Sequence, residues 1–450
     1  MKTFFVGVFV FAARTALFWY KAPTHCHRRR SDRGLVLCTG SLLLGLFLVS
    51  GVAHAQQTRA LHIGNQSVTL TSDKRSTPAL AVQMPEGDIW YGFLTSGTAP
   101  GRLTVQMPDN QIYSLTAPPP PLVHGKFQVT LNNMPANSQF SFELSAMGDF
   151  EIDWGLGTVP QVINKTNTTL TTYTSPASPR YSGGPYIVTI RGRATSYNSG
   201  EVAAIAFNNS LNRTRIIDIA GDLGSIFPIL GITAASRPRF IRTFQNLTGL
   251  TGPIPPNLFA GVQGPPASAM FASMFEGCTS LTGEIPESLF AGIQGPPTTY
   301  IFSSTFRDCR ELTGPIPSNL FAGIQGPPAS RMFMNTFINC SGLTGEIPGS
   351  LFVGIQGAPA ANMFGGTFRN ARSLTGIGTG LFDGISGAAQ TGMFENTFYD
   401  AVGLRGPAAR FTNGQLLHQR WPAATTAQVG GAFIGATGLD NWSGIPAAWR

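Results

Sequence analysis

The cysteines of this sequence are its clearest candidates for chemistry, as metal ligands or as nucleophiles. Cys278, Cys309 and Cys340 follow one another at intervals of 31 residues. Structural zinc sites pair cysteines or histidines a few residues apart, and no histidine lies between residues 125 and 417. An odd number of evenly spaced cysteines indicates a repeat position instead of a disulfide framework. We therefore expect a column of small buried side chains, with no metal and no cofactor.

Carboxylates and histidines offer the other routes to catalysis, and their spacing predicts none. Glu284 and Glu346 occupy one repeat position two copies apart, and proline takes that position in the alternating copies. Carboxylates that far apart do not form an acid–base pair. His62, His124 and His418 lie in separate segments without metal-ligand spacing, and no nucleophile elbow or phosphate-binding loop stands in its required context. We expect no catalytic residue and no enzymatic activity.

A repeat of about 31 residues fills the second half of the chain. Similar copies begin with L-T-G at Leu250, Leu281, Leu312, Leu343 and, in a less regular form, Leu374. The second copy reads LTGEIPESLFAGIQGPPTTYIFSSTFRDCRE. One such unit cannot bury its apolar residues alone, whereas stacked units can. The period therefore predicts a solenoid over residues 201–450, with atypical caps at its ends.

Each copy divides into three expected segments. The residue before a proline is extended, so L-T-G-x-I-P is predicted to be a short strand. L-F-A-G-I brings a second apolar cluster round a turn, and G-P-P ends any regular element. After G-P-P, Met270, Phe271, Phe275 and Cys278 would share one face of a helix. The sequence thus predicts a strand, a corner and a short helix in each unit.

The pattern M-F-x-x-T-F-x-x-C-x-x-L-T-G resembles the BspA-like leucine-rich repeats of bacterial surface proteins. L-T-G-x-I-P is also similar to plant-type leucine-rich repeats, but the longer L-x-x-L-x-L-x-x-N signature is missing. The resemblance covers roughly residues 215 to 446. It implies a secreted or surface protein, adhesin-like, that binds protein or glycan partners.

Residues 56 to about 200 follow a different pattern. Segments such as FQVTLNNM and YIVTIRG alternate apolar and polar residues between turn residues, which is typical of β-sandwiches. A proline run, Pro118–Pro121, cannot lie in a central strand and is expected to link two modules. The predicted modules are a β-rich one at 56–120 and a β-sandwich at 121–200.

The second module resembles PKD-type immunoglobulin-like domains. FEIDWGLGT is similar to the WGDGT hairpin of that family, and YSGGPYIVTIRG is similar to its later strand entry. Leu156 stands where the family usually has Asp. We expect Trp154 in the core and Asp153 in a turn, a calcium- or sugar-contacting role for Asp153 being the alternative.

The first 55 residues have the features of a secretory signal. Arg28, Arg29, Arg30 and Arg33 precede the apolar run GLVLCTGSLLLGLFLVSGV, which leads into the small-x-small site Ala53-His54-Ala55, and we expect cleavage after Ala55. An additional apolar stretch lies upstream, and a retained anchor is the alternative. The segment holds seven basic residues and one acidic residue, so about +2 of the formal charge of +8 remains after cleavage. That small charge gives no case for nucleic-acid binding.

The leading hypothesis is a secreted or bacterial cell-surface recognition protein, with periplasmic residence as an alternative location and no membrane insertion of the mature chain. Its expected partners are extracellular proteins or glycans, contacted at positions that differ between copies: Arg307, Arg310, Arg331 and Arg369. Four aromatic residues could instead stack on sugars or lie in cores and caps: Trp90, Tyr91, Trp421 and Trp442. A polysaccharide-associated enzyme or carbohydrate-binding accessory protein, and a structural cell-envelope protein, are the rival hypotheses.

Overall fold

A computed structural model of the chain describes strands between residues 58 and 116, and residues 125–450 except 133 and 178–184. The chain divides into two compact units, Met1–Leu122 and Val123–Arg450. The expected signal, residues 1–55, and the proline run Pro118–Pro121 lie outside the described residues.

One antiparallel sheet makes up the described part of the first unit. Its strand order is β1-β2-β4-β5-β6, and β3 pairs with β4. The strands are β1 (Thr58–Ile63), β2 (Gln66–Thr71), β3 (Leu80–Gln83), β4 (Ile89–Thr95), β5 (Arg102–Gln106) and β6 (Ile112–Thr116). Trp90 and Tyr91 belong to β4, and their side chains are outside the described part of the chain.

The second unit begins with two sheets that pack face to face. The larger has the order β10-β9-β12-β7-β14 and the smaller β11-β8-β13. The strands are β7 (Gly125–Leu131), β8 (Ser141–Leu144), β9 (Met147–Asp153), β10 (Gln161–Lys165), β11 (Thr171–Thr174), β12 (Tyr186–Ser196), β13 (Ile205–Ala206) and β14 (Ile216–Gly221).

Alternation along the strands builds the core between these two sheets. On β7, Phe127, Val129 and Leu131 are fully buried while the residues between them are more exposed, as a strand with one buried face requires. Phe142 of the smaller sheet packs against Trp154, which follows β9 of the larger one, with ring centroids 5.9 Å apart.

The second unit has no break at residue 200, where the sequence placed a domain boundary. β13 and β14 lie beyond that residue, yet each pairs into one of the two sheets. Phe127 of β7 packs on both Phe207 and Phe244, at 5.8 and 6.0 Å. The next part of the chain also hydrogen-bonds to β14, through Thr251 N–H and the Ile217 carbonyl. β14 therefore forms hydrogen bonds to the sheet on one side and to the following coils on the other.

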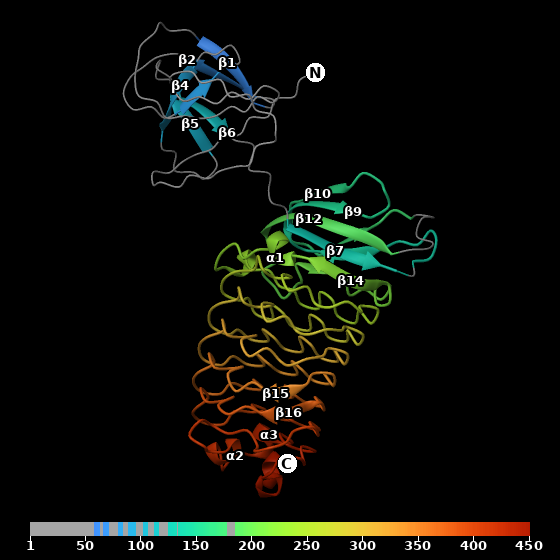
Figure 1. Ribbon diagram of the computed structural model, residues 1–450, viewed down its shortest axis with the longest axis vertical. Coiled ribbons are helices and arrows are strands. Elements are labelled where there is room, and N and C mark those ends of the chain that lie inside the picture. The colour runs from blue at the N-terminus through green and yellow to red at the C-terminus, as the bar shows by residue number, and fades with distance from the viewer. Residues whose placement is uncertain are drawn as a thin grey trace, which may run out of the picture. The chain divides into compact units, whose positions relative to one another are not determined.

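From residue 222 onward the chain winds into stacked coils, called the coil stack below (Figure 1). Its short regular elements are α1 (Leu223–Ile226), η2 (Ala234–Ser236), β15 (Gly345–Ile347), β16 (Leu374–Ile377), α2 (Leu417–Arg420), α3 (Thr426–Val429), η3 (Trp442–Gly444) and η4 (Ala447–Trp449). β15 lies in the L-T-G-E-I segment of its copy and β16 is the shorter L-T-G-I of the next copy, and the two strands pair in parallel. Parallel bridges also link successive coils at the G-I-Q-G segments, as in Gly295 with Ile324.

The segment expected to be helical is instead a series of four-residue turns. Ala269, Ser273 and Gly277 all have positive φ, which interrupts any helix at every fourth residue. Their neighbours Phe271 and Phe275 donate their N–H groups to carbonyls of the next coil, Ile301 and Thr305, at 3.0 and 2.9 Å. Because those donors are used between coils, they are not available for helical bonds. The helix prediction was wrong, although Met270, Phe271, Phe275 and Cys278 are all buried as it required.

Columns of phenylalanine fill the interior of the coil stack. Ring centroids along one column lie 5.7 or 5.8 Å apart with nearly parallel planes, through Phe271, Phe302, Phe333, Phe364 and Phe394. A second column, from the L-F-A-G segments, meets the first edge to face or tilted, as Phe290 does with Phe302 at 4.9 Å. Aromatic pairs in such arrangements contribute about 0.5–1.5 kcal/mol beyond burial. The same contact therefore recurs from coil to coil.

The last residues close the stack. Trp449 is buried against Phe394 and Phe433, with centroids at 6.1 and 6.3 Å. Among the described residues, no helix has the length and apolar character needed to cross a membrane.

Candidate binding surface of the coil stack

The cysteine column lies wholly inside the coil stack. Cys278, Cys309 and Cys340 are fully buried, and each thiol donates to the carbonyl of a phenylalanine in the preceding coil, at 3.0 to 3.1 Å. Burial raises the pKa of the Cys278 thiol to about 12 and the pKa values of the Cys309 and Cys340 thiols well above the ordinary value. Neutral, buried thiols are poor nucleophiles and poor metal ligands, so their observed role is to satisfy carbonyls between coils.

One side of the coil stack is formed by the four-residue turns; we call it the turn face. It comprises residues 267–280, 298–311, 329–342, 360–373 and 390–403. Its inward residues hardly change from coil to coil, but its outward residues do. A single column of positions reads Glu276, Arg307, Ile338, Arg369 and Tyr399, of which Ile338 is buried and the other four are partly exposed. The turn face thus combines a constant interior with a varied exterior.

The four arginines predicted from the sequence to contact a partner interact with neighbouring side chains. Arg307 and Arg310 lie 3.3 and 3.7 Å from the carboxylate of Asp308, with 41% and 59% of their side chains exposed. Arg331 donates to the Tyr300 hydroxyl at 2.8 Å, and Arg369 lies over the ring of Tyr399 at 4.6 Å. All four belong to the turn face.

Asp308 also starts a ladder of amide side chains across successive coils. Asn339 donates to Asp308 at 2.7 Å, and Asn370 donates to Asn339 at the same distance. Asp308, Asn339 and Asn370 each have positive φ, which asparagine and aspartate tolerate better than other non-glycine residues. The ladder therefore fixes the turns of this face in register.

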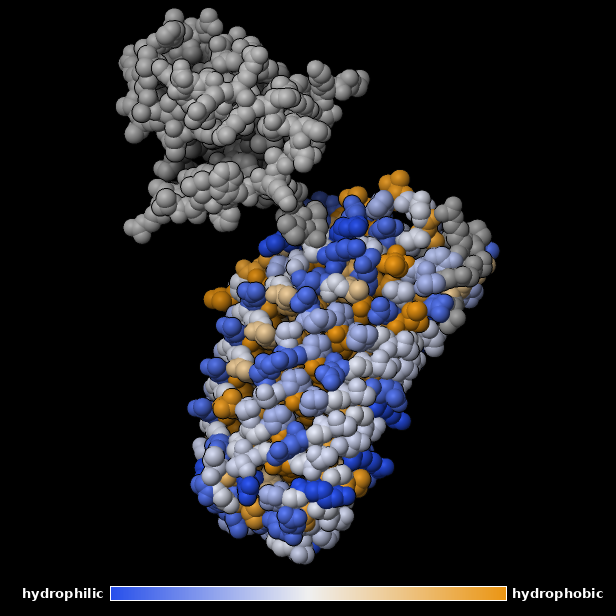
Figure 2. Space-filling view, viewed as in Figure 1, coloured by the Kyte–Doolittle hydropathy of each residue, from blue (hydrophilic) through white to orange (hydrophobic). Residues whose placement is uncertain are grey.

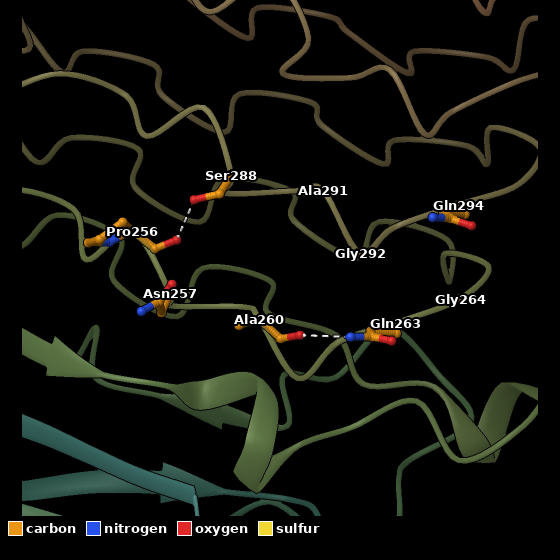
Figure 3. Close-up of a pocket in the computed structure, with 9 residues that line it drawn as sticks. All are labelled: Pro256, Asn257, Ala260, Gln263, Gly264, Ser288, Ala291, Gly292 and Gln294. Atoms are coloured by element: carbon orange, nitrogen blue, oxygen red, sulfur yellow. Dashed lines mark hydrogen bonds between the residues drawn. The ribbon is translucent and has the colours of Figure 1, made fainter. Parts of the chain in front are cut away.

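The L-F-A-G-I-Q-G segments cover the core from another side; we call this the groove face. It comprises residues 256–264, 287–295, 318–326, 349–357 and 379–387. Coils approach very closely here: a Cβ on Gly292 or Gly323 would lie 2.4 or 2.1 Å from a carbonyl oxygen of the preceding coil. Between the first two coils, nine residues line a groove of about 380 Å³ (Figure 3).

The residues that line the groove were not among those predicted from the sequence to contact a partner. They include Gln263 and Gln294, exposed members of a column that continues through Gln325 and Gln356. The repeated glutamine could have indicated this groove. A polar, exposed residue does not need to be kept for packing, so its recurrence in successive copies suggests another role.

The hairpin between β9 and β10 holds Trp154 and Asp153 in structural positions. Trp154 is buried in the core between the sheets, and its indole N–H donates to Gln161 Oε1 at 3.1 Å. The carboxylate of Asp153 accepts from Gly155 N–H at 2.9 Å, which shapes the turn.

The aromatic residues near the C-terminus are occupied within the fold. Trp421 is buried and its indole N–H donates to the Gly387 carbonyl at 2.7 Å, while Trp442 donates to the Phe433 carbonyl at 3.2 Å. Arg450 covers the Trp442 ring at 4.9 Å. Neither indole is free to present its face and its N–H together to a sugar.

Histidines and carboxylates do not gather at one point. Among the described residues, no group of three or more His, Cys, Asp and Glu side chains is placed to hold a metal ion. Glu284 and Glu346 are exposed in coils separated by a third coil. His418 is buried, which lowers its pKa, and its Nδ1 has no partner in the described structure.

Comparisons with protein-family models, curated proteins and solved structures give no match to this chain.

Proposed function

We propose that this protein is a secreted or surface-exposed recognition protein, adhesin-like and non-enzymatic, that binds extracellular protein or glycan partners through the repeat surface. In this proposal the coil stack is a leucine-rich-repeat-like solenoid, and the expected signal of residues 1–55 directs export.

One observation carries the proposal: the coils repeat their interior and vary their exterior. Phe271, Phe302 and Phe333 are equivalent and buried, whereas the column that contains Glu276, Arg307 and Tyr399, all partly exposed, changes in charge and size along the stack. Repeat scaffolds of this kind present extended surfaces for binding. Hydrophilic and apolar side chains are interspersed over the surface shown in Figure 2.

The test is to probe an array of extracellular glycans and host surface proteins with the purified protein. We expect saturable binding to at least one ligand, and loss of binding when the protein is heat-unfolded. A folded protein that binds nothing saturably would contradict the proposal. Turnover of a bound polysaccharide or peptide would favour the enzyme hypothesis instead.

For a protein ligand, the turn face is the part to alter first. Replacing Arg307, Arg310, Arg331 and Arg369 together by alanine removes half-exposed positive side chains while leaving the buried columns intact. Arginine is enriched among residues that dominate binding at protein interfaces, so we expect weaker capture of that ligand by tenfold or more.

A further inference from the structure

The groove face carries polar side chains without charge around a shallow apolar floor. The groove between its first two coils is lined by Pro256, Asn257, Ala260, Gln263, Gly264, Ser288, Ala291, Gly292 and Gln294 (Figure 3). Glu287 and Asp383 are the charged residues within the five segments of the groove face, and neither lines this groove. No side chain that lines the groove would form an ion pair with a charged ligand.

Several of these polar groups are available to a ligand. Within residues 125–450 as described, the side-chain amides of Asn257 and Gln294 have no protein partner in hydrogen-bond range. The Ser288 hydroxyl donates to the Pro256 carbonyl at 2.8 Å and keeps its acceptor capacity. Amides and hydroxyls both donate and accept, which suits a ligand rich in hydroxyl groups.

The main chain of the groove is already used. Gly264 N–H donates to the Gly292 carbonyl, and Gln294 N–H donates to the Gly264 carbonyl, both at 2.9 Å. An extended peptide that binds by strand addition needs an unpaired edge, and this segment of the coil does not offer one. The binding groups are thus side chains, which favours a glycan over a peptide.

The same groups recur along the stack. Glutamine occupies one outward position in four successive segments of the groove face, at Gln263, Gln294, Gln325 and Gln356, and Ser386 takes it in the fifth, while outward positions of the turn face change from coil to coil. Successive coils joined by parallel bridges are separated by about 4.8 Å. A row of identical groups at a regular spacing fits a polymer of identical units better than it fits an irregular protein surface.

From these observations we infer that the groove face binds an extended, uncharged polysaccharide that lies along successive coils. The amide groups of Asn257 and Gln294 would bond its hydroxyls, together with the Oε1 of Gln263, whose Nε2 already donates to the Ala260 carbonyl at 3.4 Å. Ala260 and Ala291 would contact its carbon-bound hydrogens. This inference rests on the recognition function proposed above and assigns it a ligand class and a face.

Calorimetric titration of the purified protein with uncharged β-linked oligosaccharides tests the inference. The probes are hexasaccharides of 1,4-linked glucose, 1,4-linked mannose, 1,4-linked xylose and 1,3-linked glucose, each with its disaccharide. We expect at least one hexasaccharide to bind saturably, tenfold or more tightly than its disaccharide, because only the longer chain spans several coils.

Two arginine substitutions, one on each of two neighbouring copies of the repeat, locate the site. Ala291→Arg fills the groove, whereas Thr279→Arg places on the turn face the residue that the next coil already has as Arg310. We expect Ala291→Arg to weaken hexasaccharide binding at least tenfold and Thr279→Arg to leave it unchanged. If Ala291→Arg lowers the melting temperature, the paired substitution of Asn257 and Gln294 by alanine, both exposed, takes its place with the same expectation.

Failure of this inference differs from failure of the proposed function. Lack of binding to all four hexasaccharides, or weakening by Thr279→Arg alone, overturns the groove assignment. If the array then shows a protein ligand that the turn-face variant no longer captures, recognition stands without the groove. If neither assay detects a ligand, both proposals fail.

Discussion

The sandwich at the start of the second unit and the coil stack that follows share a core but hold it together differently. In the sandwich, β7 pairs with β12 and β14, so Phe127 is aligned with both Ile190 and Gly221. In the coil stack, Phe271, Phe302 and Phe333 each contact the equivalent residue one repeat away. Sandwich residues thus depend on distant parts of the chain, and coil residues on their immediate neighbours.

This difference implies different responses to damage. A stack with nearest-neighbour contacts opens locally, whereas a sandwich of interdependent strands loses its packing as a whole. The junction belongs to both, because β14 hydrogen-bonds to β7 on one side and to the first coil on the other. The sandwich therefore covers the first coil as a cap.

The largest expected effect comes from removing one ring at the junction and one inside the stack. Phe127→Ala and Phe333→Ala each delete a fully buried ring and should each destabilise the protein by about 3–5 kcal/mol. Hydrogen exchange should show opening across the sandwich and the first coils for Phe127→Ala, but only around residues 302–364 for Phe333→Ala. Unchanged protection of residues 240–278 in the Phe127→Ala variant would show that the two regions have separable cores.

A single methyl group between coils should have the next largest effect. In Gly323→Ala the new Cβ would lie 2.1 Å from the Ile293 carbonyl oxygen, so the coils must separate. We expect a loss of about 1–3 kcal/mol in the free energy of unfolding, measured by denaturant titration. Gly444→Ala is the control, since no atom lies within 4 Å of the added Cβ, and should change stability by about 0.5 kcal/mol or less. Equal effects of the two substitutions would contradict close approach of the coils.

Alkaline pH should weaken the coil stack through its thiols. Burial raises the pKa of the Cys278 thiol in the folded state to about 12, while an exposed thiol in the unfolded chain ionises near 9. The folded state therefore binds more protons above pH 9, and its stability falls as the pH rises, by about 1.4 kcal/mol per thiol for each pH unit.

Alanine at Cys278, Cys309 and Cys340 removes this dependence, as the stack already has Ala371 and Ala401 at that position. The measurement compares the stability lost between pH 8 and pH 10 by the natural chain and by the triple variant. Equal losses would show that the thiols are not buried in the folded state. The sandwich, which contains no cysteine, should keep its hydrogen-exchange protection better than the coils over this range.

The smallest effect is expected on the turn face. Arg331 contacts Tyr300 of the preceding coil through its hydroxyl and its ring, both partly exposed. A double-mutant cycle with Arg331→Ala and Tyr300→Ala should give a coupling of about 0.5–1 kcal/mol. A coupling above 2 kcal/mol would mean that outward columns, and not only the buried ones, hold the coils together.

Much of the second unit could be predicted from particular residues. The apolar and polar residues of FQVTL and YIVTI predict β7 and β12, and the cysteine spacing predicts a buried column. These features can be predicted because they depend only on the types and spacing of residues close together in the sequence. The prediction of a helix from Met270 to Cys278 was wrong, and the local pattern of apolar residues could not have shown why. Turns of four residues and a helix of 3.6 residues per turn bury nearly the same positions, and donation to the next coil decides between them.

Of the two candidate binding surfaces, the sequence predicted residues of the turn face but none of the groove. Arg307, Arg310, Arg331 and Arg369 stood out because they vary, and the structure places them all on the turn face. The groove was not predicted, because residues from two different coils line it, Asn257 from one and Gln294 from the next.

The period of the repeat, the residues of its buried columns and the alternating strands before them can all be predicted from the order of the amino acids. Those features depend on which side chains are apolar and are therefore buried, and this property belongs to each residue type. Tertiary structure decided that β14 joins the sandwich to the first coil, that backbone donors bond between coils, and that glutamines of successive coils line one groove. These features depend on which segments become neighbours in the folded chain. The sequence does not show which group a backbone N–H or an exposed amide will contact.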